Sequence, residues 1–344
     1  MVFAVFSLGV FIAAMAITAL VRTYSLRRSV LDIPSHRSSH RKPMPRGGGL
    51  AISVVCLGAI LALGYVGWLS HTTAIALIGG GVMVSVIGWI DDHQGVSALW
   101  RALVHLGAAF WALWWLGGLP MLDIGIAKVS LGFVGPVVAS LGVAWLINLY
   151  NFMDGTDGIA GVQALCAGVL GAMFLYNSGE RGLAAVSLSL AIASAGFLVW
   201  NWPPARIFMG DVGSCFLGFT FAVLALASEL TGALPALVWS ILLAVFIWDA
   251  TFTLLKRLAS GKRWYVAHRS HAYQRLIQLG LTHRQVALGV LLVNLMIVWP
   301  LAFLGYRRGD LVALSAACAL LMMWIIWFII QRAYQRKVRG EADT

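Results

Sequence analysis

Long apolar segments recur along this chain, and they constrain its fold more than any other feature. Of its 344 residues, 60% are hydrophobic and only 11% are charged. About 20 apolar residues in a helix are enough to cross a bilayer. A soluble protein of this length needs much more polar surface. The sequence therefore predicts an all-α polytopic integral membrane protein, with residues 1–344 forming a single domain.

We expect eleven transmembrane helices. The candidate spans are Val2–Val21, Gly47–Leu69, Thr72–Ile90, Leu99–Gly118, Leu131–Tyr150, Ile159–Tyr176, Leu183–Val199, Val212–Ser228, Pro235–Leu255, Val286–Leu304 and Leu311–Ile330. Between the fourth and fifth spans, residues 119–130 alternate apolar and polar side chains, which is typical of β-strands. We expect a short surface hairpin there.

Lysine and arginine residues fall mainly on one side of these spans. With the N-terminus outside, the cytoplasmic segments are 22–46, 91–98, 151–158, 200–211, 256–285 and the tail 331–344. Together with Arg101 they hold 20 of the 24 basic residues. Cytoplasmic loops of membrane proteins are enriched in these residues. The C-terminus is therefore expected in the cytoplasm, and the net charge of +11 requires no nucleic-acid partner.

The few acidic residues converge on the same side. The chain has only 13, and three cytoplasmic loops supply Asp91, Asp92, Asp154, Asp157 and Asp211. An ion-coupled transporter is the alternative, since acids in membrane proteins often mark an ion path. Acids spread through the bilayer depth, often with inverted repeats, would indicate such a carrier. The clustering on one side favours an enzyme.

The aspartate pair Asp91 and Asp92 closes the third span in GWIDDHQGVS. Adjacent carboxylates repel each other, and a cation relieves that repulsion. The alternative is a solvated helix end, but acids at a helix C-terminus oppose the helix dipole. We expect a catalytic pair, with one carboxylate accepting a proton from an attacking phosphate or orienting it.

The loop NLYNFMDGTDGIAG (148–161) offers Asn148, Asn151, Asp154 and Asp157 at three-residue intervals. Residues three apart share a face of a helical turn. Amide and carboxylate oxygens are the ligands that Mg²⁺ prefers. We expect Asn151 and Asp154 to bind Mg²⁺ or Mn²⁺, and Asn148 and Asp157 to bind substrate. The alternative for Asp157 is a cap on the sixth helix.

The string NWPPARIFMGDVGSCFLG (201–218) places Asp211 between Gly210 and Gly213 at the start of the eighth span. A helix cap is a serious alternative, because aspartate is a favoured cap residue. The glycines and the nearby Arg206 favour a metal or phosphate site. We expect Asp211 to bind the metal and Arg206 the substrate.

Two basic loops supply candidate phosphate ligands. VAHRSHAYQRL (266–276) contains His268, Arg269 and His271, and guanidinium groups around the histidines favour diphosphate binding. DIPSHRSSHRKPMPRGGGL (32–50) contains Lys42 and Arg46 before three glycines. The alternative for both loops is an attachment to anionic lipid headgroups.

Taken in order, PRGGGL, GWIDD, NFMDGTDGIAG, RIFMGDVGS and AHRSHAYQRL resemble the motifs of the polyprenyl-phosphate N-acetylhexosamine-1-phosphate transferases, which include WecA-type and MraY-type enzymes. The resemblance covers residues 32–276. It implies a Mg²⁺-dependent reaction at the cytoplasmic face of the bacterial inner membrane. A UDP-sugar would donate its sugar-1-phosphate to undecaprenyl phosphate and release UMP.

The resemblance also implies roles residue by residue. Asp91 and Asp92 match the family's aspartate pair, and Asp211 matches its metal-binding aspartate. Asn151, Asp154 and Asp157 match its nucleotide- and metal-binding loop, and His268 and His271 match its histidine loop.

Two departures from the family pattern are visible. Many members carry a lysine soon after the aspartate pair, and here Arg101 is the candidate substitute. HRSH replaces a run of adjacent histidines, which argues against the muramoyl-pentapeptide branch. It favours the branch that begins O-antigen or capsule chains with N-acetylglucosamine or a 6-deoxy-N-acetylamino sugar. Direct attack and an aspartyl-phosphate intermediate both stay open, as does a homodimer.

Two further expectations concern the loops. Asp249 lies within the ninth span, where an unpaired carboxylate is costly, so we expect it to meet a cation of the 256–275 loop. His268, Arg269 and His271 should contact the sugar-diphosphate side of the donor. Lys42 and Arg46 should serve the nucleotide or the acceptor phosphate.

Overall fold

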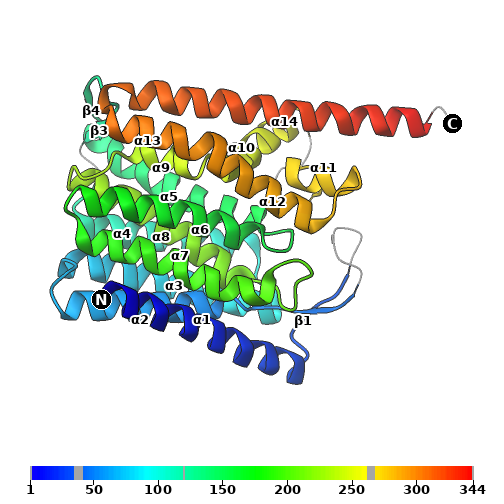
Figure 1. Cartoon of the computed structure of the whole chain (residues 1–344), viewed down its shortest axis with the longest axis horizontal. Helices are drawn as coiled ribbons and strands as arrows, with labels where there is room; N and C mark the ends of the chain where they lie inside the picture. The colour runs from blue at the N-terminus through cyan, green and yellow to red at the C-terminus, as the bar shows by residue number, and fades with distance from the viewer. Residues whose placement is uncertain (1, 35–41, 119–120, 262–267, 343–344) are drawn as a thin grey trace.

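Long helices lie side by side along one axis and form a bundle, with the N- and C-termini at opposite ends (Figure 1). The structure is a computed structural model that describes residues 2–34, 42–118, 121–261 and 268–342. Apolar side chains from the central helices fill the interior of the bundle, and α6, α7 and α8 are the most deeply buried of the apolar helices.

Helices account for most of the chain. They are α1 (Val2–Arg27), α2 (Leu50–Tyr65), α3 (His71–Gln94), α4 (Ala98–Leu116), α5 (Gly135–Met153), α6 (Ile159–Asn177), α7 (Arg181–Asn201), α8 (Asp211–Leu230), α9 (Ala236–Leu242), α10 (Ala244–Ala259), α11 (Ala272–Gln278), α12 (His283–Val293), α13 (Trp299–Arg307) and α14 (Val312–Ala342). Short 3₁₀ turns are η1 (Gly132–Val134) and η3 (Gly309–Leu311), and η2 (Asn294–Val298) is a π-helical segment between α12 and α13.

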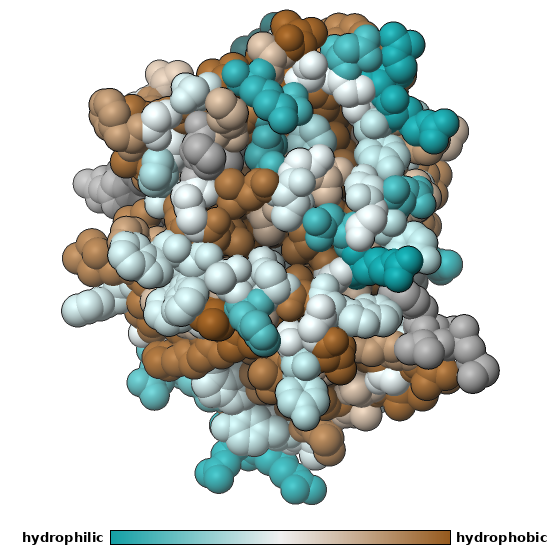
Figure 2. Space-filling model, turned by 90° about the vertical axis from the view of Figure 1, so that its left-hand side faces the viewer, coloured by the Kyte–Doolittle hydropathy of each residue, from teal (hydrophilic) through white to brown (hydrophobic). Residues whose placement is uncertain are grey.

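Two small antiparallel sheets complete the fold. Strand β1 (Leu31–Asp32) pairs with β2 (Met44–Pro45), and β3 (Met121–Asp123) pairs with β4 (Lys128–Ser130). The second pair confirms the hairpin predicted for residues 119–130, of which 119–120 lie outside the described residues. The surface at this end of the bundle mixes hydrophilic and hydrophobic side chains (Figure 2).

Each predicted span coincides with one helix or with consecutive helices, so the all-α polytopic fold is confirmed. Among the described residues, eight helices are long and apolar enough to cross a membrane, and the bent pair α9–α10 adds a ninth crossing. The other two predicted spans fall short. Helix α2 has only 16 residues, and α4 carries Arg101 in its first turn, yet they pack against α7 and α3 in the same bundle.

The ninth predicted span, Pro235–Leu255, is not one continuous helix. It bends by 81° between α9 and α10. The side-chain amide of Gln163 donates to the Leu242 carbonyl at this bend (2.9 Å), and Asn294 donates to Gln163 (3.0 Å). Backbone groups freed within a membrane need such partners. This buried amide chain therefore stabilises the bend.

Glycines allow the segment before α2 to lie directly against the start of α8. The amides of Gly48 and Gly49 donate to the carbonyls of Phe208 and Met209 (2.9 and 2.8 Å). A Cβ atom on Gly49 would collide with the backbone of Gly213. This close approach brings the 42–49 loop, with Arg46, beside Asp211, which is a packing role that the sequence did not predict for the glycines.

Candidate active site

Asp92 forms the structural centre of the predicted carboxylate cluster. Its side chain is fully buried, and it accepts hydrogen bonds from the backbone amides of Asp211 (2.9 Å) and Val212 (3.3 Å). These amides open helix α8 and have no partner within that helix. Asp92 therefore caps α8 from the end of α3. The cap that we considered for Asp211 is supplied by Asp92 instead.

Close packing around this cap requires two further glycines. A Cβ atom on Gly210 would collide with the Asp92 carboxylate. A Cβ atom on Gly88 would lie 2.6 Å from the backbone of Asp211 and of Val212. The ends of α3 and α8 are thus held together at backbone distance, which fixes the separation between the aspartate pair and Asp211.

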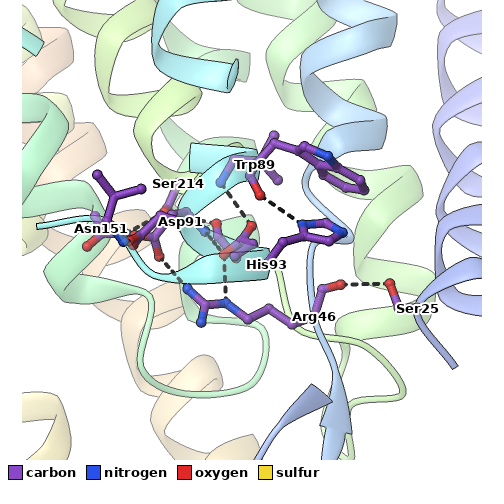
Figure 3. A network of polar contacts seen from close by, with 12 residues as sticks. Ser25, Arg46, Trp89, Asp91, His93, Asn151 and Ser214 are labelled. Atoms are coloured by element: carbon purple, nitrogen blue, oxygen red, sulfur yellow. Dashed lines mark hydrogen bonds and ion pairs between the residues drawn. The ribbon is translucent and has the colours of Figure 1, made fainter. Parts of the chain in front are cut away.

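Two arginines join the three carboxylates. Arg46 contacts Asp92 through Nε (2.6 Å) and Asp211 through Nη2 (3.0 Å). Arg101 contacts Asp91 (2.9 Å) and Asp211 (3.1 Å) through Nη1. Figure 3 shows Arg46 reaching the cluster from its loop, with Asp91, Asn151 and Ser214 around it. Guanidinium groups favour such paired contacts with oxyanions.

The neighbouring carboxylates stabilise the protonated, positively charged form of Arg46. Burial alone would lower the pKa of Arg46, but the carboxylates of Asp92 and Asp211 raise it above its ordinary value. The hydroxyl of Ser25, near the end of α1, donates to the Arg46 carbonyl (2.9 Å). Arg46 is therefore a permanent cation whose backbone is also fixed.

The metal-binding prediction for the 151–157 loop concerns residues beside this cluster. Asn151 donates through Nδ2 to Ser214 on α8 (3.1 Å), and this bond leaves its Oδ1 uncommitted. Burial, together with the nearby carboxylates of Asp211 and Asp92, raises the pKa of Asp154 well above its ordinary value. Negative charge is therefore concentrated around Asp154, Asp211 and Asp92.

Whether these residues suit a divalent cation follows from their chemistry. Carboxylates and an amide oxygen are the hard donors that Mg²⁺ takes. The crowding that disfavours ionised Asp154 is relieved by a cation. Within the described ranges, no three His, Cys, Asp or Glu side chains are arranged as a ready-made metal site. The donor set fits Mg²⁺, but a bound ion has to compete with Arg46 and Arg101 for the carboxylates.

Asp157 does not cap α6, because the cap position is occupied by Gly158. Its carboxylate contacts His283 Nδ1 (3.0 Å) and accepts the backbone amide of Ala205 (3.0 Å). Burial alone would raise the pKa of Asp157, but His283 and the Ala205 amide outweigh it and hold the pKa below its ordinary value. Asp157 therefore joins its own loop to the segment of Ala205 and to the start of α12, where His283 lies.

A groove of about 620 Å³ opens beside Asp157. Its lining contains the apolar residues Pro203, Pro204 and Phe208 and the cations Lys42 and Arg284. A volume of this size is typical of small-molecule sites, which combine apolar walls with a few polar groups. Phe208 is three residues from Asp211, and Asp157 is three residues from Asp154. The groove is therefore adjacent in the chain to the carboxylate cluster on two sides.

As expected, Asp249 faces the interior of the bundle, but its hydrogen bonds come from backbone amides and the Thr253 hydroxyl rather than from a cation. The carboxylate accepts the backbone amides of Ala272 (2.7 Å) and Tyr273 (3.2 Å), and it lies 3.8 Å from His271 Nδ1. Asp249 on α10 thus supports the start of α11. His271 is only 3% exposed, so its side chain faces this buried carboxylate rather than an open site.

The rest of the histidine loop lies beside it. His268 stacks near His271, with ring centroids 4.9 Å apart, and burial with the neighbouring His271 and arginines lowers the pKa of His268 to about 4. The hydroxyl of Tyr273 donates to the Phe152 carbonyl (2.9 Å). This bond connects α11 to the end of α5, one residue from Asn151.

Other predicted site residues lie outside the carboxylate cluster. Arg206 is exposed against the ring of Trp200 and does not reach the aspartates. Asn148 donates to the Ala144 carbonyl of its own helix (2.7 Å). Lys42 lines the groove, and Arg269 lies in the histidine loop, where its carbonyl accepts Gln278 (2.9 Å).

Several residues at this site were not predicted. Asn201 accepts the Gly158 amide (2.8 Å) and donates to the Ile207 carbonyl (2.9 Å), and it thereby joins two of the functional loops. His283 contacts the Asp157 carboxylate, and the Tyr273 hydroxyl donates to the Phe152 carbonyl. None of them sits in a spacing pattern, so their roles depend on contacts between distant segments.

Comparison with known proteins agrees with the ordered motifs. The family model of glycosyl transferase family 4 matches residues 74–229, which include all the carboxylates of the cluster. A probable undecaprenyl-phosphate N-acetylglucosaminyl 1-phosphate transferase of Bacillus subtilis is 31% identical, over 82% of this chain and 79% of its own.

Two further proteins are similar to this chain over most of their length. A decaprenyl-phosphate N-acetylglucosaminephosphotransferase of Mycolicibacterium smegmatis is 29% identical over 79% of this chain and 74% of its own. A phospho-N-acetylmuramoyl-pentapeptide-transferase of a Synechococcus strain is 33% identical over 73% of this chain and 74% of its own.

Proposed function

Because the chain belongs to the polyprenyl-phosphate N-acetylhexosamine-1-phosphate transferases of glycosyl transferase family 4, we propose that it transfers a sugar-1-phosphate from a UDP-sugar to undecaprenyl phosphate and releases UMP. One observation carries the proposal. Three carboxylates and two arginines from four separate segments meet at one end of a membrane bundle. Family membership leaves no support for the transporter alternative.

The two arginines would bind the phosphates of both substrates. Each guanidinium now bridges two carboxylates, and phosphate oxygens offer the same paired acceptor geometry. A phosphate that enters the cluster can therefore replace a carboxylate at Arg46 or Arg101. The transferring phosphoryl group gains negative charge as the bond to UMP breaks, and fixed cations stabilise that charge.

The two members of the aspartate pair would have different tasks. Asp92 is fully buried, caps α8 and positions Asp211. Asp91 is partly exposed beside Arg101, so it can reach an acceptor phosphate, remove its proton and orient it. The freed phosphate oxygen then attacks the β-phosphorus of the donor. The bond from that phosphorus to the oxygen bridging to UMP breaks, and UMP leaves with this oxygen.

The groove beside Asp157 would hold the nucleoside. Phe208 and the two prolines offer an apolar wall to a base, and the Asp157 carboxylate offers acceptor oxygens to its N–H or to ribose hydroxyls. Lys42 and Arg284 also line the groove, and their charges would bind the diphosphate of the donor. This assignment keeps the expectation that Lys42 serves the nucleotide end.

We also propose that Asp211, Asp154 and Asn151 hold Mg²⁺. A bound Mg²⁺ would polarise the phosphoryl group and neutralise the charge of the leaving UMP. Arg46 and Arg101 would then be free to turn from Asp211 to the substrate phosphates. The residues therefore exchange partners: the carboxylates take the cation and the arginines take the phosphates.

The donor sugar is proposed to be N-acetylglucosamine or a 6-deoxy-N-acetylamino sugar, in the first membrane step of O-antigen or a related envelope polysaccharide. Two of the reported relatives are named for N-acetylglucosamine transfer, and HRSH departs from adjacent histidines. The basic loops favour a site on the cytoplasmic face of the bacterial inner membrane.

The test uses purified protein with undecaprenyl phosphate and a panel of UDP-sugars, among them UDP-N-acetylglucosamine and UDP-N-acetylmuramoyl-pentapeptide. We expect a lipid-linked sugar diphosphate and an equal amount of UMP from an N-acetylamino sugar. Asp211→Asn should lower turnover at least about 100-fold, the range of one lost electrostatic group. Arg206→Gln is the matched control and should keep turnover near wild type. Product from the pentapeptide donor alone would overturn the sugar assignment, and product from no UDP-sugar would overturn the proposed reaction.

A further inference from the structure

A second basic cavity lies between α10, α11 and α14, away from the carboxylate cluster. It has a volume of about 190 Å³, and its lining includes Lys256, Arg257, Ser260, Arg275, Gln331 and Tyr334. None of its lining residues belongs to the carboxylate cluster or to the groove beside Asp157. The transfer reaction proposed above therefore does not use this cavity.

The charge of the cavity is unbalanced. Three of its lining residues are cations, and no described lining residue is an aspartate or glutamate. The sequence itself has no acidic residue between Asp249 and Asp310, and Asp249 is occupied with the start of α11. Lys256 donates to the neutral Gln331 (3.3 Å) and lies 5.3 Å from the centre of the Trp327 ring. The cavity thus offers positive charge without a carboxylate from this part of the chain.

Arg275 shows the imbalance most clearly. Its guanidinium stacks on Tyr334 at 3.7 Å and donates to the neutral Gln278 (2.7 Å). Its Nε is buried and has no hydrogen-bond partner among the described residues. Burial lowers the pKa of Arg275, and nearby Arg269 acts in the same direction. An anion beside Arg275 would reverse both effects.

The cavity also stands at the level expected for lipid headgroups. Helix α14 belongs to a candidate span of 33 residues, longer than the roughly 20 that cross the hydrocarbon, so its last turns extend beyond it. Trp327 lies one turn before Gln331 and donates to Thr253 on α10 (3.0 Å). Tryptophan and tyrosine are enriched at the membrane surface, and Tyr334 continues this face of α14.

We propose that Lys256, Arg257 and Arg275 bind a phosphate group in this cavity, supplied by the headgroup of an anionic membrane lipid. Ser260 and Gln331 position the lysine beside the phosphate: the Ser260 hydroxyl donates to the Lys256 carbonyl (2.8 Å), and Lys256 Nζ donates to Gln331 Oε1 (3.3 Å). The bound headgroup fixes the end of α10 against α14. It thereby supports α11, which begins directly after His271.

The test is a thermal-stability titration of the full-length protein in an uncharged detergent. The probes are dioctanoyl phosphatidylglycerol, dioctanoyl phosphatidylcholine and inorganic phosphate. A ligand that binds only the folded state raises Tm with its concentration, which gives an apparent affinity. We expect phosphatidylglycerol to stabilise the wild type more than phosphatidylcholine does. The double variant Lys256→Gln/Arg275→Gln should bind it at least about tenfold more weakly, the effect of one lost charge-assisted hydrogen bond.

Arg336→Gln/Arg339→Gln is the matched control, since it removes the same charge from the exposed end of α14. It should bind like wild type. Arg275→Lys keeps the charge and should retain most of the binding, which guards against a folding defect in the double variant. Stabilisation by inorganic phosphate that depends on the same residues would support the site with a free ion as its source. Equal lipid stabilisation of all variants would overturn the proposal.

Discussion

The division of tasks within the aspartate pair gives a sharp prediction for Asp92→Asn and Asp91→Asn. The two substitutions are chemically identical and one residue apart. Asp92 is fully buried and holds two backbone amides and Arg46, whereas Asp91 is partly exposed and holds Arg101 and the amide of Val96. The first should therefore cost mainly stability, and the second mainly turnover.

The magnitude for Asp92→Asn follows from these contacts. Removing one partner of a buried ion pair costs about 3–5 kcal/mol when the other charge is left uncompensated. Arg46 keeps Asp211 and retains 28% exposure of its side chain, which reduces that cost. The Nδ2 group of the asparagine would also face a backbone N–H, so that two donors meet, which costs roughly 1–3 kcal/mol of stability. We expect a net loss of about 2–4 kcal/mol, or roughly 4–8 °C in Tm.

Asp91→Asn should behave differently. The asparagine oxygen can still accept the Val96 amide, and Arg101, whose side chain is 32% exposed, keeps Asp211. The loss should therefore be about 1 kcal/mol, below that of a fully buried pair. Turnover should fall at least about 100-fold, because the proton acceptor is lost. Tm would be measured by tryptophan fluorescence in detergent at one scan rate, with turnover measured on the same preparations. Equal Tm values for both variants would refute the structural task of Asp92.

Three other predictions follow from particular contacts. Gln163→Leu removes the hydrogen-bond partner of the Leu242 carbonyl at the α9–α10 bend. It should lower Tm by about 2–4 °C, because buried membrane hydrogen bonds contribute up to about 1.7 kcal/mol each. An unchanged Tm would contradict this role. The pKa of Asp157 lies below its ordinary 3.8, so its stabilisation is complete above that value and is lost as the pH falls through the lower folded pKa. The Tm difference between wild type and Asp157→Asn should therefore shrink as the pH is lowered from about 5 to about 3, and a constant difference would exclude the ion pair with His283. Chelation of divalent cations should abolish turnover, Mg²⁺ should restore it, and full activity in excess chelator would remove the metal from the reaction.

Patterns that follow from composition and period could be predicted from the sequence. Apolar length gave the helices, alternation over residues 119–130 gave the hairpin, and the distribution of basic and acidic residues placed the three carboxylate loops on one side. The structure brings Asp91, Asp92 and Asp211 together as those loops require. These features are encoded locally, in residue type and spacing.

Features that depend on contacts between distant segments could not be predicted. The sequence predicts metal binding for Asp211, with a helix cap as the alternative, and catalysis for Asp92. The packing of α3 on α8 makes Asp92 the cap of α8. The α9–α10 bend depends on Gln163 from another helix, and no proline marks it. The burial of His271 beside Asp249 likewise depends on packing between distant segments, and its contact with substrate stays a prediction.

Placement of Arg206 shows the same limit. Its position five residues before Asp211 favoured a phosphate ligand, but its side chain is exposed and lies against the Trp200 ring. Arg101, by contrast, was suggested only as a substitute for a missing lysine. Its position in the first turn of α4 places its guanidinium between Asp91 and Asp211.

A label on the donor's β-phosphate distinguishes transfer of sugar-1-phosphate from transfer of the sugar alone. UDP-N-acetylglucosamine labelled with ³²P at the β-phosphate would be incubated with the purified protein and undecaprenyl phosphate, and the lipid and nucleotide products would be separated. Transfer of sugar-1-phosphate predicts that the label moves into the lipid diphosphate and that the released nucleotide is unlabelled UMP. Release of labelled UDP, with an unlabelled sugar on the lipid, would mean that the sugar alone is transferred and would contradict the account.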